Sequence, residues 1–105
     1  MERSQLIYLK LKTKDMGKYS VSYTVEKIVD NIQIEPIGFS SIEFLLIGDD
    51  TAKIFNNIPL NSDQRSFEFI NRPNEIISVN IPVTFDGVGS VKEIVVIKAF
   101  YEQIT

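Results

Sequence analysis

The most constraining feature of this sequence is the strict alternation of apolar and hydroxyl side chains over residues 19–25. Tyr19, Val21, Tyr23 and Val25 are separated by two serines and a threonine. Successive side chains of an extended strand point to opposite faces. The pattern therefore predicts an antiparallel strand with one buried face and one solvated face.

A second strand is predicted just before it, because apolar residues occupy every second position from Ile7 to Leu11. The intervening residues 13–17 include an Asp and a Gly, which suit a tight connection. We therefore predict a β-hairpin formed by residues 5–12 and 19–25.

Residues 25–32 carry a signal with a different period, since four apolar residues there follow helical spacing. The segment is short, β-branched and poorly capped. An extended strand with a bend near Asp30 and Asn31 is therefore the alternative to one helical turn. The four apolar residues are Val25, Ile28, Val29 and Ile32.

Apolar or alternating runs continue to the end of the chain, separated by turn-forming residues. Pro82 has no N–H for a strand ladder, so its strand is expected to lie at a sheet edge or to end there. The final run is the most apolar, and we expect a central strand in which Ile97 is buried and does not tolerate Asp. Strands are predicted over residues 32–36, 42–47, 51–55, 66–70, 75–83 and 91–102, with a loop over 58–64.

Seven or eight short strands, with turn signals roughly every 8–12 residues, predict an all-β fold. The expected architecture is an antiparallel β-sandwich of immunoglobulin-like or jelly-roll type, with at most one helical turn. A chain of 105 residues has the size of one domain, so we expect a single domain over residues 1–105.

The amino-acid composition removes most catalytic chemistry. The chain contains no Cys and no His, which excludes disulfides, thiolate and imidazole catalysis and the commonest metal sites. A net charge of −3 argues against nucleic-acid binding, and the apolar runs 44–47 and 94–97 are too short to cross a bilayer. We predict no enzyme activity, no catalytic, cofactor or metal site, and no nucleic-acid or membrane partner.

Four aspartates are candidates for paired-carboxylate catalysis, and residues 48–51 and 61–63 for a calcium site. Each aspartate lies in a predicted turn, where Asp is favoured by its hydrogen bonds to backbone N–H groups. Neither loop has the ligand spacing of a dedicated calcium loop. We therefore interpret these residues as turn residues; they are Asp49, Asp50, Asp63 and Asp86.

The glycines of residues 86–90 invite comparison with a phosphate-binding loop, but a β-branched segment follows in place of a helix. We predict a hairpin loop there. Five aromatic residues are candidates for a sugar-stacking platform, although their strand positions favour burial in the core. They are Tyr8, Tyr19, Tyr23, Phe39 and Tyr101.

A small all-β chain without this chemistry is best interpreted as a module that binds another protein or itself. Sheet edges carry unpaired backbone groups that proteins either block or use for assembly. Residues 42–47 and 94–97 are apolar on both faces, which suits a doubly covered strand or an oligomer interface. The residues that suggest blocked edges are Lys10, Lys12, Lys14 and Pro82.

Four segments resemble the strand and turn layout of small virion proteins of tailed bacteriophages, namely residues 44–51, 54–60, 66–69 and 95–101. Those proteins are β-sandwich subunits of the head-decoration, auxiliary capsid or tail-accessory type. The resemblance implies a structural subunit that binds major capsid or tail subunits, or itself as a homo-oligomer. It also implies a virion location, with assembly in the host cytoplasm.

The alternative function is a carbohydrate-binding or adhesion module. This alternative predicts an exposed tyrosine patch and normally an export signal. Residues 1–9 show no apolar leader followed by a cleavage site, so we predict no secretory signal. Because strands are predicted close to both ends, we also expect the chain to be a complete gene product.

Overall fold

The structure, a computed structural model, describes residues 18–104. Within these residues it contains eight β-strands and no helix. The predicted hairpin partner, residues 5–12, lies outside the described residues, as do Lys10, Lys12 and Lys14. The strands are β1 (Tyr19–Ile28), β2 (Ile32–Ile34), β3 (Ser41–Leu46), β4 (Ala52–Ile54), β5 (Ile58–Leu60), β6 (Ser66–Ile70), β7 (Ile81–Phe85) and β8 (Ile94–Gln103).

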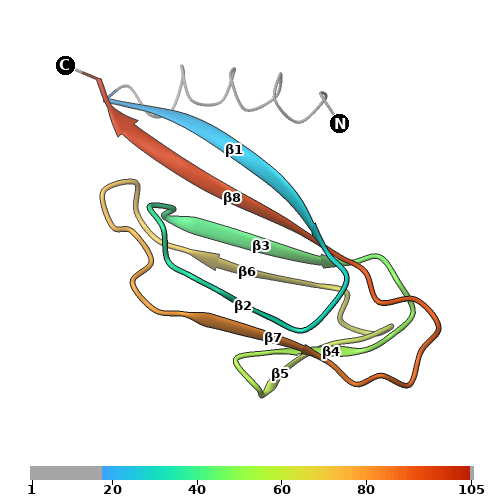
Figure 1. Cartoon of the computed structure of the whole chain (residues 1–105). Helices are drawn as coiled ribbons and strands as arrows, with labels where there is room; N and C mark the ends of the chain where they lie inside the picture. Colours follow the sequence, from blue (N-terminus) through green and yellow to red (C-terminus); the bar gives the residue numbers. More distant parts are fainter. Residues whose placement is uncertain (1–17, 105) are drawn as a thin grey trace.

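The strands form two antiparallel sheets of four strands each (Figure 1). The first sheet has the order β1-β8-β3-β6 and the second the order β2-β7-β4-β5. The first half of the chain pairs with the second half in reverse order, since β1 pairs with β8, β2 with β7, β3 with β6 and β4 with β5. The prediction of an all-β antiparallel fold is therefore confirmed.

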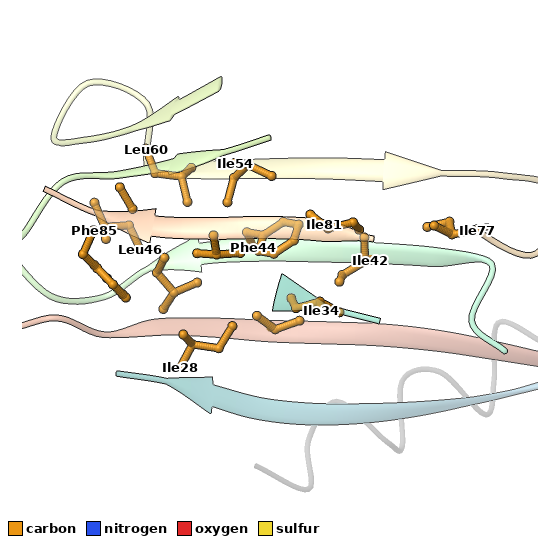
Figure 2. Close-up of a cluster of buried hydrophobic side chains, with 14 of the residues drawn as sticks. Ile28, Ile34, Ile42, Phe44, Leu46, Ile54, Leu60, Ile77, Ile81 and Phe85 are labelled. Carbon is orange, nitrogen blue, oxygen red and sulfur yellow. The ribbon is translucent and has the colours of Figure 1, made fainter. Parts of the chain in front are cut away.

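The hydrophobic core lies between the two sheets (Figure 2). Every second residue of β3 and of β7 is buried, as expected for strands with one face on a core. Phe44 is the residue of β3 at the centre of this layer, and its ring stacks on Phe67 of β6 with centroids 6.4 Å apart. The largest fully buried apolar side chains are Phe39, Ile42, Phe44, Ile54, Leu60, Ile77, Ile81, Val83, Ile94 and Val96.

β1 and β8 are longer than the strands beside them, with ten residues each against six in β3. The ladder between β3 and β8 ends at Ser41 and Ala99, so the last residues of β8 pair with β1 alone. Figure 1 shows this end of β1 and β8 extending beyond the other strands as a two-stranded ribbon.

The bend predicted near Asp30 and Asn31 is present, and the alternative of a helical turn is wrong. β1 continues to Ile28, and β2 begins at Ile32 in the other sheet. The side-chain oxygen of Asn31 accepts the N–H of Phe85 at 2.7 Å, which fixes the bend against the end of β7.

The predicted loop over residues 58–64 contains strand β5. Phe55 and Asn56 both have positive φ angles, of 57° and 69°, and the chain reverses there within three residues. Ile58 consequently returns directly opposite Ile54. Pro59 is tolerated in β5 because this strand lies at the edge of its sheet.

The bounds predicted for the strand over residues 75–83 are wrong, because β7 begins at Ile81 and continues to Phe85. Pro82 is also not at a sheet edge, since β7 lies between β2 and β4. Its carbonyl accepts the N–H of Phe55 at 3.0 Å, but it has no N–H to return. This is a physical reason for the ladder with β4 to stop at Ile54.

β8 is an interior strand of the first sheet, as predicted, but the expectation that Ile97 is buried in it is wrong. Ile94 and Val96 are fully buried against the core, whereas Ile97 is half-buried on the opposite side of the strand. Sequence periodicity separates these two faces without saying which one meets the second sheet.

Candidate interaction surface

The apolar side of β1 points away from the core. Residues directly opposite each other in a ladder share a face, and Val25 lies opposite the outward-facing Ile97. The face of residues 19–25 that was predicted to be buried therefore lies on the outside of the first sheet. The other apolar partners along this side are Val21 with Tyr101 and Tyr23 with Ala99.

The polar side of β1 lies on the same side of the sheet as the core. Ser22, Thr24 and Glu26 are exposed there, because β1 is an edge strand of the sheet. Glu26 pairs with Lys98 at 3.3 Å, and the Lys98 ammonium lies 5.3 Å from the centroid of the buried Phe39 ring. Polar groups thus close the core at the base of the ribbon, while the apolar residues of β1 face outward.

The outer face of the first sheet is predominantly apolar. Val25 is 42% exposed and Ile70 is 67% exposed, while Val21 and Ala99 are buried. Exposed apolar side chains on one face of a sheet mark a candidate interaction site. The outer face consists of Tyr19, Val21, Tyr23, Val25 and Lys27 of β1, Val95, Ile97, Ala99, Tyr101 and Gln103 of β8, Ser41, Glu43 and Leu45 of β3, and Ser66, Glu68 and Ile70 of β6.

Two carboxylates stand directly opposite each other on this outer face. Glu43 of β3 is the cross-strand partner of Glu68 of β6, an arrangement of like charges that destabilises a sheet. Burial and the neighbouring Glu68 charge raise the pKa of Glu43. No cation within residues 18–104 forms an ion pair with either carboxylate. Both line a cleft of about 160 Å³ together with Ile70 and Ile97.

The aromatic candidates divide between the core and the outer face. Phe39 is fully buried, so the core interpretation is correct for it. Tyr19, Tyr23 and Tyr101 are half-buried on the outer face, so the core interpretation is wrong for these three. Tyr8 lies outside the described residues.

Asp50 is a fully buried carboxylate that holds the loop over residues 86–90. It accepts the backbone N–H groups of Gly87, Val88 and Gly89 at 2.9, 3.1 and 3.0 Å. Burial raises its pKa, but these hydrogen bonds and the charge of Lys92 outweigh burial, so that the pKa of Asp50 is lowered. A Cβ atom on Gly89 would lie 2.6 Å from the Asp50 backbone, so the approach requires glycine there. The loop joins β7 to β8 across the two sheets and is not the predicted hairpin.

The other three aspartates occupy surface loops. Asp49 accepts the N–H of Val91 at 2.7 Å, and Asp86 accepts the hydroxyl of Thr51. Asp63 is exposed in a turn in which the side chain of Asn61 accepts its N–H at 2.9 Å. All three lie in loops, as interpreted from the sequence, and the partners of the Asp49 and Asp86 carboxylates come from distant loops.

A larger cleft of about 540 Å³ lies where these loops meet, and its charged groups already have partners. Arg65 donates to the carbonyl of Leu46 at 2.8 Å, and Glu93 pairs with Lys27 at 3.5 Å. Residues 18–104 contain no group of three or more acidic side chains placed to hold a metal ion. The same part of the chain has no helix long and apolar enough to span a membrane.

Comparison with protein-family models, curated proteins and solved structures finds no match to this chain. Sequence reasoning identified the amphipathic character of residues 19–25 but missed that the apolar side forms a surface. Local sequence could not have revealed it, because Lys98 and Glu102 lie on the side of the final strand that faces the core and so favour the opposite assignment.

Proposed function

We propose that this chain is a non-enzymatic structural subunit that docks onto a neighbouring protein subunit through the outer face of its first sheet. The observation that carries the proposal is the orientation of β1, whose tyrosines and valines point outward while its hydroxyl residues lie on the core side. Removing apolar area from water stabilises a complex by about 25 cal/mol per Å². A partner protein that covers this face therefore gains this stabilisation.

The strand order supports a jelly roll as the finer fold class. A jelly roll has eight strands in two sheets, and the reverse-order pairing of β1 with β8 through β4 with β5 is the pattern of one long hairpin rolled into two sheets. Capsid subunits use this architecture, as do lectins. Fold alone does not set function. Together with the sequence resemblance, it supports a virion accessory role with capsid or tail subunits, or further copies, as partners.

A carbohydrate-binding or adhesion module is the second candidate. It is favoured by one observation, the presence of Tyr19, Tyr23 and Tyr101 together on the outer face. Aromatic side chains with a polar tip provide flat surfaces on which sugar rings can stack. In this case Tyr101→Ala would abolish measurable glycan binding, whereas docking on a protein would depend on the aliphatic residues as well.

Site-specific photo-crosslinking in cells that assemble the complete particle or complex tests the proposal. A crosslinking amino acid is placed at Val25, on the outer face, and at the exposed Lys53 of β4 as a control on the second sheet. We expect a discrete protein adduct from Val25 and none from Lys53. The adduct's mass distinguishes a second copy from another protein. Absence of an adduct at Val25, or equal yields at both positions, would contradict docking through this face.

A further inference from the structure

The β6 edge of the first sheet presents free backbone hydrogen-bonding groups. Beside the strand, Leu46 donates to the carbonyl of Arg65 at 2.7 Å and Asn71 donates to that of Ser40 at 3.1 Å. Bonding alternates along an antiparallel ladder, so the residues between these pairs direct every second N–H and C=O away from β3. The outward-directed residues are Ser66, Glu68 and Ile70.

This edge lacks the features that protect the other edges of the two sheets. β5 contains Pro59, β2 has only three residues, and β1 carries Lys27. β6 has neither Pro nor Lys among its five residues. The local blocks are the side chain of Gln64, which donates to the Ser66 carbonyl at 2.7 Å, and the charge of Glu68.

The rim of the core beside β6 is only half covered. Phe67 and Phe69 project from this strand toward the core but remain partly exposed. Phe55, from the turn after β4, meets Phe69 edge-to-face at 5.9 Å across the gap between the sheets. An additional strand on β6 would therefore cover aromatic surface on its inward side.

The side chains of β6 on the outer face determine which residue of an added strand fits opposite Glu68. A residue paired with Glu68 would extend the row that already contains Glu43. Both carboxylates lack an ion-pair partner in the described part of the chain, and burial beside Glu68 raises the pKa of Glu43. A Lys or Arg at this position relieves the like-charge contact, since opposite charges stabilise cross-strand pairs.

We propose that β6 receives an extended strand from a different protein, with a basic residue opposite Glu68 and apolar residues on either side of it. The basic residue compensates Glu68 and Glu43 on the outer face, and its apolar neighbours cover Phe67 and Phe69. This proposal rests on the proposed docking function and names the chemistry of the partner that the first sheet accepts.

The test uses a capped synthetic peptide, Val-Thr-Val-Lys-Val-Thr-Val, and a control peptide in which Glu replaces Lys. Binding to the full chain is followed by NMR through the backbone amide shifts of Glu68 and Ile70. Ile70→Pro blocks the edge without removing a bond to β3, because the Ile70 N–H points outward. Glu68→Lys reverses the charge, and the exposed Glu35→Lys is the matched control.

We expect saturable binding of the Lys peptide, weakened roughly fivefold or more by Glu68→Lys, abolished by Ile70→Pro and unchanged by Glu35→Lys. Absence of shifts at β6, equal binding of the Glu peptide, or binding indifferent to both β6 variants would overturn the proposal. Self-association of the chain that Ile70→Pro abolishes would make a second copy the occupant and overturn a separate partner. Crosslinking from Val25 despite failure of the peptide would leave docking intact and remove only strand addition.

Discussion

Replacing Phe44 with Ala is the sharpest test of which face of the first sheet forms the core. Phe44 is fully buried and stacks on Phe67. An aromatic side chain buries roughly 150–250 Å², which at about 25 cal/mol per Å² corresponds to about 4–6 kcal/mol of gross burial. Because Ala retains part of this, the expected loss in the free energy of unfolding is about 3–5 kcal/mol. At roughly 4–8 °C per kcal/mol, Tm should fall by at least about 12 °C.

The matched control is Leu45→Ala, at the next position of the same strand but on the outer face. Both variants are measured by thermal and urea unfolding, followed by circular dichroism at low protein concentration so that self-association does not contribute. We expect Leu45→Ala to lower the free energy of unfolding by about 1 kcal/mol, the centre of the distribution for single substitutions. A loss for Leu45→Ala equal to or larger than that for Phe44→Ala would refute the assignment of the two faces.

Three further outcomes follow from individual residues. Val96→Asp should unfold the chain, whereas Ile97→Asp should retain the circular dichroism of a β-sheet protein; unfolding by Ile97→Asp would place that residue in the core. The lowered pKa of Asp50 means that its stabilising contribution is complete above the ordinary Asp pKa and is lost as pH falls through the lowered value. Asp50→Asn should therefore flatten the acid side of the Tm-versus-pH profile. An unchanged profile would contradict a stabilising role for the hydrogen bonds between the Asp50 carboxylate and the loop over residues 86–90. The raised pKa of Glu43 means that its ionisation destabilises the folded state. Glu43→Gln should thus raise Tm at neutral pH and have no effect below the ordinary Glu pKa, and a lower Tm at neutral pH would refute this.

Much of the secondary structure could be predicted from local patterns. Alternation identified β1 and β6 and a continuous apolar run identified β3, each to within a few residues, and the bend near Asn31 followed from polar residues between apolar runs. β5 was missed because its three residues contain Pro59 and have too little sequence to show a period. Its turn depends on positive φ at Phe55, which is unusual for an aromatic residue and has no strong sequence signal.

The candidate surface was less predictable, since several of its features depend on pairs of residues far apart in the chain. The contact of Glu43 with Glu68 exists only because β6 pairs with β3 in one register, and a shift by one residue would separate the two carboxylates. The same is true of Asp50, whose partners lie in a loop more than thirty residues away. Turn propensity correctly placed Asp50 in a loop but identified no partner for it.

The sequence by itself determined that this chain forms short amphipathic strands, because the two-residue period of a strand is written in neighbouring residues. It also determined that this sequence supplies no thiolate and no imidazole group, because it contains no Cys and no His. Only the tertiary structure decided which face of each strand meets the core, since a period-two pattern is identical whichever side is buried. For β1 that choice placed the apolar side outward, and long-range pairing with β8 thereby put the residues of the proposed docking surface on the outside of the sheet.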